Sequence, residues 1–107
     1  MKIEFKEKTY EMQPVTAGRK IDVSSTILSL TKGTFNDMVI SDPSTALLVE
    51  AQVYIMYYIP DLSEDMRVSI WEMSLKDAYS YVELCKDIIK PKIEEEERIY
   101  RELFSKK

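Results

Sequence analysis

The run PSTALLVEAQVYIMYYI, from Pro43 to Ile59, is the most apolar stretch of the chain. Asp42 precedes it and can accept hydrogen bonds from the first free N–H groups of a helix, while Pro43 suits the first helical position. Pro60 follows it and cannot continue the helix without the loss of a hydrogen bond. These signals predict a helix of about four to five turns that fills the run.

The predicted helix is apolar on nearly every side, which is typical of a membrane span or of the centre of a helical bundle. The run is shorter than the roughly 20 residues that a span requires, and Glu50 and Gln52 interrupt it. We therefore expect the fold to be mainly α, a small helical bundle around this central helix, in an intracellular, soluble protein without a signal peptide.

Composition limits the functional classes. The chain has 107 residues, which favours a single domain over residues 1–107. Its net charge of −4 argues against nucleic acid as the main partner, because phosphate binding requires clustered Lys and Arg. It has no histidine and one cysteine, Cys85, which we expect to be buried. Nothing indicates a catalytic, metal or cofactor site, so we do not expect an enzyme.

The N-terminus predicts a β-hairpin. Residues 2–6 and 9–12 alternate between apolar and polar side chains, and a two-residue turn at Glu7-Lys8 places the apolar side chains on one face. The predicted cross-strand pairs are Lys6 with Thr9, Phe5 with Tyr10, and Ile3 with Met12. A lone hairpin is only marginally stable, so it must rest on a helix or pair with another chain.

Between the hairpin and the central helix, Thr16 is the expected N-cap of a helix that runs to about Thr31, with Gly33 at the C′ position. Residues 35–40 fit either a short helix or an extended link. The first of these helices carries two apolar stripes: Ala17, Ile21, Ser24 and Leu28; and Val23, Ile27 and Leu30.

After the central helix, Ser63 is expected to cap a short helix from Glu64 to about Met73 with Met66, Ile70 and Trp71 on its inner face. Ser74 and Asp77 resemble a capping box that opens the last long helix. Pro91 predicts a kink or break, which divides a helical body at residues 16–90 from a C-terminal helix at residues 92–107.

Charged side chains have simple expected roles. Glu94 to Glu97 point in four directions on a helix, so we expect a solvated face rather than a metal site. Glu50 is expected at a helix edge or as the partner of a lysine. The pairs Glu94–Arg98 and Glu97–Arg101 have the favourable i,i+4 order.

Aromatic residues are the stronger functional signal. Seven tyrosines occur, and adjacent pairs such as Tyr57-Tyr58 cannot share one face, so some must reach the surface or keep only their hydroxyls wet. We expect the binding of a protein partner through Tyr81, Ile99, Tyr100, Leu103 and Phe104. Removal of residues 92–107 is expected to weaken partner capture without unfolding residues 1–90.

The order of the expected elements resembles that of a known family, which narrows the kind of protein partner. The hairpin KIEFKEKTYEM leads into Pro-Val-Thr-Ala at residues 14–17 and a helix, and the helical body ends in an acidic, Arg-containing helix. This layout resembles that of the tail assembly chaperones of long-tailed bacteriophages. The resemblance implies a non-enzymatic protein of the bacterial cytoplasm that binds the tape-measure or tail-tube protein during tail morphogenesis and forms homo-oligomers.

Two other classes remain open on the residues. A small acidic regulatory module, such as an antirepressor or an inhibitor of a host protein, would bind a folded basic partner tightly. An enzyme that uses carboxylates alone is disfavoured by the absence of histidine and the scarcity of glycine.

Overall fold

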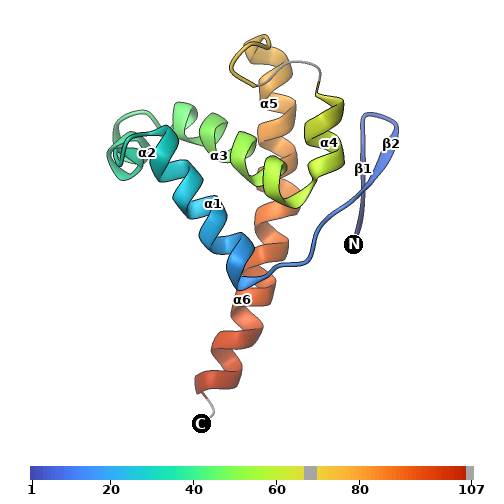
Figure 1. The fold of residues 1–107 in the computed structure, drawn as a ribbon, viewed down its shortest axis with the longest axis vertical. Helices are drawn as coiled ribbons and strands as arrows, with labels where there is room; N and C mark the ends of the chain where they lie inside the picture. The colour runs from blue at the N-terminus through green and yellow to red at the C-terminus, as the bar shows by residue number, and fades with distance from the viewer. Residues whose placement is uncertain (67–69, 106–107) are drawn as a thin grey trace.

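The computed structural model describes residues 1–66 and 70–105. It is mainly helical with an N-terminal two-stranded hairpin, which confirms the expected fold class (Figure 1). The elements are β1 (Lys2–Phe5), β2 (Lys8–Glu11), α1 (Ala17–Leu30), α2 (Phe35–Ser41), α3 (Pro43–Tyr58), α4 (Pro60–Asp65), α5 (Leu75–Leu84), the π-helical turn η1 (Cys85–Ile89) and α6 (Lys90–Ser105).

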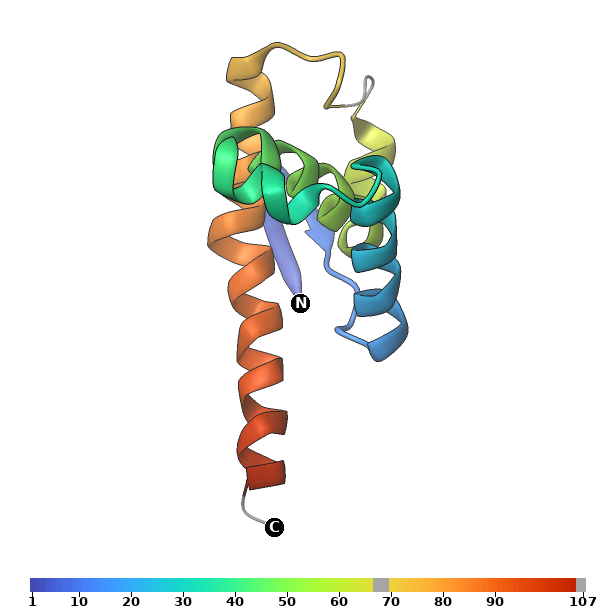
Figure 2. The same ribbon diagram turned by 90° about the vertical axis from the view of Figure 1, so that its left-hand side faces the viewer.

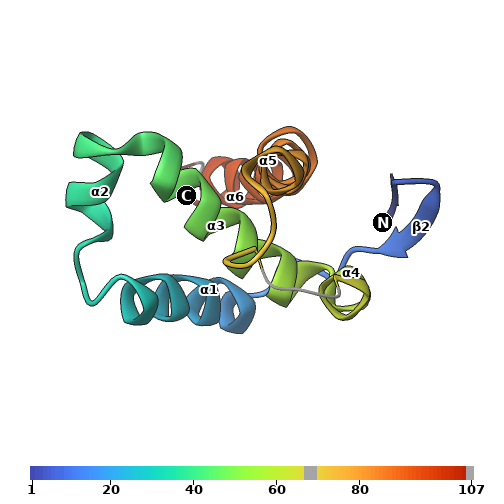
Figure 3. The same cartoon turned by 90° about the horizontal axis from the view of Figure 1, so that it is seen from above.

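Helix α3 is the centre of the molecule. Its N-cap Asp42 accepts a hydrogen bond from the backbone N–H of Thr45, and Pro43 occupies the first turn, as the sequence predicts. Helix α1 lies on one side of α3, and α5 and α6 lie on the other (Figures 2 and 3). Side chains on several sides of α3 are therefore buried, including Val53 and Ile55 at 0% exposure.

The two polar residues inside α3 connect it to other segments. The Glu50 carboxylate accepts a hydrogen bond from Lys90 Nζ at 2.6 Å, which confirms the expectation of a lysine partner. The Gln52 amide is buried, and its Oε1 accepts a hydrogen bond from the backbone N–H of Ile70 at 2.8 Å. Each polar group is thus satisfied by a segment distant in the sequence, and desolvation of an unpaired group is avoided.

Helix α1 begins and ends near the predicted residues. The Thr16 hydroxyl caps it by accepting from the N–H of Arg19 at 3.1 Å. At its other end the Gly33 N–H donates to the Leu28 carbonyl and the Lys32 N–H to the Ser29 carbonyl, which is a Schellman motif. Lys32, with a φ of 53°, therefore occupies C′, and Gly33 lies one position later than predicted.

Only one of the two predicted stripes of α1 faces the core. Val23 and Ile27 are buried against α3, and Leu30, from the same stripe, is 46% exposed. The other stripe faces solvent, with Ile21 63% and Leu28 49% exposed. Of the two structures expected for residues 35–40, the short helix is the one present, as α2.

The prediction of a helix from Glu64 to Met73 is wrong. Pro60 is tolerated at the first position of α4, which begins at once and ends at Asp65. Of the predicted inner face, Ile70 is buried, but Trp71 lies in a turn and is 60% exposed. Residues 67–69 of the predicted helix lie outside the described residues.

The hairpin exists, but its register differs from the prediction by two residues. Ile3 pairs with Tyr10 and Phe5 with Lys8, so the turn is Lys6-Glu7 rather than Glu7-Lys8. Both turn residues have positive φ, 49° and 69°, as a tight two-residue hairpin turn requires. A shift of two preserves the side-chain faces, because strand side chains alternate with a period of two.

The hairpin rests on α4 and α5. The Asp65 carboxylate accepts hydrogen bonds from Lys8 Nζ at 3.1 Å and from the Tyr10 hydroxyl at 3.0 Å. These hydrogen bonds lower the pKa of Asp65. The rings of Phe5 and Tyr81 meet edge to face with their centroids 5.1 Å apart, and Lys6 Nζ lies 4.7 Å from the Tyr81 centroid. The hairpin is thereby held by aromatic and charged contacts as well as by its own strand pairing.

Pro91 does not break the last helix. The backbone widens into η1 just before it, where the Lys90 N–H donates to the Cys85 carbonyl in a five-residue π turn. Helix α6 then includes Pro91 and continues to Ser105. The widened turn relieves the clash that a proline ring makes with a regular helix, so α5, η1 and α6 form one continuous rod (Figures 1 and 2).

Candidate partner-binding site

The site is built on α6, whose body-facing side continues past the body itself. Ile89 and Ile93 point into the core, at 0% and 6% exposure. Tyr100 and Phe104 follow Ile93 at spacings of seven and four residues, which places them on the same side of the helix. The last part of α6, however, extends away from the rest of the chain (Figure 2).

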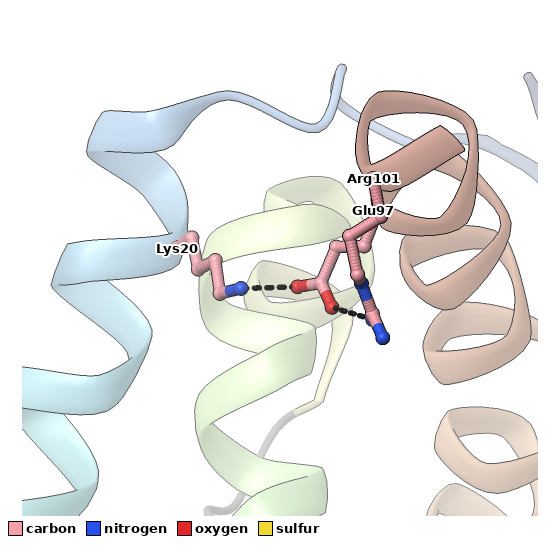
Figure 4. Close-up of polar contacts among 3 residues, drawn as sticks. All are labelled: Lys20, Glu97 and Arg101. Atoms are coloured by element: carbon pink, nitrogen blue, oxygen red, sulfur yellow. Dashed lines mark hydrogen bonds and ion pairs between the residues drawn. The ribbon is translucent and has the colours of Figure 1, made fainter. Parts of the chain in front are cut away.

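A charged contact marks the point where α6 leaves the body. Lys20 of α1 donates a hydrogen bond to one oxygen of the Glu97 carboxylate, and Arg101 Nη2 lies 3.3 Å from the other oxygen (Figure 4). The hydrogen bond from Lys20 is the main reason that the pKa of Glu97 is lowered. This contact joins the N-terminal part of α1 to α6, two elements that otherwise pack on opposite sides of α3.

Below Glu97 lies the segment that we call the C-terminal tip, residues 98–105. Four of the five predicted partner-binding residues lie on it, and all four are exposed: Ile99 at 45%, Tyr100 at 58%, Leu103 at 56% and Phe104 at 68%. They form one apolar strip along about two turns of helix. The structure thus brings these four side chains together on a projecting element.

The fifth predicted residue, Tyr81, does not belong to this group. It is only 8% exposed, because it lies on α5 under the hairpin and contacts Phe5 and Lys6. The expectation that its side chain is available to a partner is therefore wrong. Sequence spacing shows that Tyr79 and Tyr81 point apart, but it does not show that the hairpin covers Tyr81.

Charges surround the tip without forming a metal site. Arg98 Nη1 lies 3.5 Å from Glu102 rather than pairing with Glu94 as predicted, while the predicted Glu97–Arg101 pair is present. Glu95 and Glu96 both lie 3.9 Å from Lys92. Within residues 1–66 and 70–105 no three acidic or thiol side chains are grouped in a way that could hold a metal ion.

Burial governs the ionisation of two groups in the interior, the Cys85 thiol and the Tyr54 hydroxyl. Burial raises the pKa of the Cys85 thiol to about 12, so it stays protonated at neutral pH. Burial also raises the pKa of Tyr54 to about 12, with a further contribution from the Glu50 carboxylate. Both groups feel the Glu50 carboxylate, and both belong to or pack against the hydrophobic core.

A second apolar surface was not foreseen from the sequence. A hollow of about 260 Å³ lies where the start of α5 meets α3, lined by Thr45, Leu48, Val49, Ile70, Trp71, Met73, Leu75 and Ala78. Trp71 and Leu75 at its edge are 60% and 59% exposed. The sequence predicts Trp71 on the inner face of a helix, and the signal against that prediction is that Trp71 lies three residues before Ser74, the N-cap of the next helix.

No helix in the described part of the chain is long and apolar enough to cross a bilayer. The chain matches no family model, no curated protein and no solved structure.

Proposed function

We propose that this chain is a non-enzymatic binding protein that holds an apolar helical segment of another protein against its C-terminal tip. The observation that carries this proposal is the continuation of the core-facing side of α6 into solvent, with four exposed apolar side chains on residues 98–105. A helix that presents such a strip pairs naturally with a second amphipathic helix. The net charge of −4 favours the solubility of the resulting complex.

The partner that fits this arrangement best is a long helical protein prone to aggregation, such as the tape-measure protein of a phage tail. The layout resemblance to tail assembly chaperones implies the tape-measure or the tail-tube protein, and the exposed apolar strip favours whichever partner offers apolar helical segments. On this proposal the tip covers the partner's apolar strip transiently and leaves when the partner assembles.

The test compares tip variants in the presence of the tape-measure protein encoded in the same genome. Deletion should remove residues 98–107 rather than 92–107, because Ile93 belongs to the core and Glu97 bonds Lys20. The shortened protein should keep the melting temperature of the full chain and lose at least about tenfold in partner affinity, as expected when an interface centre is removed.

Leu28→Glu on α1 is the matched control, because Leu28 is similarly exposed at 49% but lies far from the tip in the sequence. It should capture the partner normally, whereas Leu103→Glu should not. Equal capture by the Leu103→Glu protein and the full chain would exclude the tip as the binding surface. A genome that encodes no long helical tail protein would exclude the tail-assembly role and favour a regulatory binding module instead.

A further inference from the structure

A second hollow lies beside α6, on the body side of the tip. The segment that joins β2 to α1, residues 12–16, forms one wall of it, and α6 forms the opposite wall. We call it the connector hollow. Met12, Pro14 and Val15 make the first wall largely apolar, and Lys92 and Glu96 belong to the second. Its volume of about 400 Å³ lies in the range of pockets that bind ligands, so it has room for a large apolar side chain.

The connector wall is held in place by hydrogen bonds to the helical body. The Gln13 N–H donates to the Tyr58 carbonyl at 2.8 Å, and Arg19 Nη1 donates to the Pro14 carbonyl at 2.6 Å. Val15 packs against the hydrophobic core. A ligand in the connector hollow therefore meets a wall that is already ordered, which lowers the entropic cost of binding.

The face of α6 that lines the connector hollow continues into the tip. Successive intervals of four, three and four residues keep side chains on one face of a helix, and these intervals separate Lys92, Glu96, Ile99 and Leu103. Ile99 and Leu103 are two of the four exposed apolar side chains of the tip. A helix that lies on them and follows the same face of α6 toward the body reaches the connector hollow.

We infer that the connector hollow holds the end of the partner's apolar helical segment, so that the binding site is a groove from Leu103 to Val15. This inference rests on the proposed function, because the tip holds the rest of the segment. The end of the segment places a large apolar side chain against Pro14 and Val15, as anchor residues do in pockets at interface centres. The apolar stems of Lys92 and Glu96 cover the other side of that anchor.

The length of the groove sets a requirement on the partner. Leu103 and Lys92 are eleven residues apart, which is roughly 16 Å at 1.5 Å per residue. A segment that fills both the tip and the connector hollow must keep its apolar face over about three turns of helix. Shorter apolar stripes contact the tip alone, so the groove selects long amphipathic helices.

The experiment measures how fast an introduced thiol reacts with a maleimide in the full chain, with and without the tape-measure protein encoded in the same genome. Glu96→Cys places the thiol in the connector hollow, Leu103→Cys places it on the tip, and Glu95→Cys is the matched control. Glu95 neighbours Glu96 and also lies 3.9 Å from Lys92, but it does not line the connector hollow. The native Cys85 adds little background, because it is buried and its pKa is raised to about 12.

Saturating partner should slow the reaction of the thiols at positions 96 and 103 by at least about tenfold, and at position 95 by less than about twofold, because the centre of an interface excludes solvent. A second pair of variants blocks the hollow instead of probing it. Glu96→Trp fills the hollow and should weaken partner capture by at least about tenfold, whereas Glu95→Trp should not. Both variants remove a 3.9 Å contact to Lys92, and both should keep the melting temperature of the full chain.

Other outcomes overturn the inference. Protection of the Leu103→Cys thiol without protection of the Glu96→Cys thiol places the partner on the tip alone and leaves the proposed function standing. Partner capture without protection at either position overturns the proposed function together with this inference. Equal protection at positions 95 and 96, or unchanged capture by the Glu96→Trp protein, excludes an anchor in the connector hollow. Protection of position 96 that rises with the concentration of the chain alone assigns the hollow to a second copy instead of the partner.

Discussion

The rod from Leu75 to Ser105 behaves differently above and below Glu97. Above it, Ile89 and Ile93 are almost fully buried against α3; below it, Tyr100 and Phe104 continue the same helical side but are more than half exposed. The amphipathic pattern is the same in both parts, and what differs is the presence of a neighbouring element. An amphipathic helix therefore identifies a face that needs covering, but not whether the same chain supplies the cover.

The largest expected effect comes from shortening a side chain in the buried part. Ile89→Ala should lower the free energy of unfolding by about 2–5 kcal/mol, because it leaves a cavity in a close-packed site. Leu103→Ala on the tip should change it by less than about 0.5 kcal/mol, since that side chain is 56% exposed. Urea denaturation followed by circular dichroism measures both values. Equal losses would show that the tip is packed in solution.

A smaller loss in the free energy of unfolding is expected when the ion pair between the rod and α3 is removed. The Lys90–Glu50 side chains are 33% and 13% exposed. Burial opposes the charged form of Lys90, but the hydrogen bond and the attraction of Glu50 outweigh it and raise the pKa of Lys90. Lys90→Met should cost about 1–3 kcal/mol, because it leaves a largely buried carboxylate without its partner.

Lys92→Met is the control for this second prediction. The Lys92 side chain has nearly the same exposure, 34%, but its carboxylate neighbours are 3.9 Å away and more exposed. The Lys92→Met protein should lose less than about 0.5 kcal/mol in free energy of unfolding, because exposed ion pairs contribute little to stability. The comparison is measured by chemical denaturation at neutral pH, and equal losses at the two positions would contradict a special role for the buried pair.

The smallest loss in the free energy of unfolding is expected at the Lys20–Glu97 pair, where the rod leaves the body. The Lys20–Glu97 pair should contribute about 0.2–1 kcal/mol, because Lys20 is largely exposed. The folded-state pKa of Glu97 lies below its ordinary value of 4.5, so this contribution is present at neutral pH. It is lost as the pH falls through that lowered pKa.

Thermal melts of the full chain and of the Lys20→Met protein between about pH 7 and pH 3 test this third prediction. The difference between the two should shrink as the solution becomes more acidic. Glu97→Gln should lose at least as much stability as Lys20→Met at neutral pH, because it also removes the pair with Arg101, and the double variant should lose no more than Glu97→Gln alone. A difference that persists at the acidic end would assign the effect to packing of the Lys20 stem rather than to charge.

Much of the local structure followed from the sequence. Thr16, Asp42 and Ser74 cap α1, α3 and α5 as predicted, because capping depends on a side chain and an N–H three residues away. The apolar run of α3 predicted a buried helix, since a helix without a polar side has no face to give to water. The sequence also predicted Ile99, Tyr100, Leu103 and Phe104 as partner-binding residues, and all four are exposed.

The tertiary structure decided what depends on distant segments. Two hairpin registers satisfy the same alternation, and the register with a Lys6-Glu7 turn brings Lys8 and Tyr10 to Asp65. Tyr81 is buried because the hairpin lies on it, and Pro91 is accommodated by a widened turn within a rod packed on α3. The exposure of Trp71 beside a hollow depends on where α3 meets α5. Local chemistry sets where helices begin, but burial is a property of surfaces that meet only after the chain has folded.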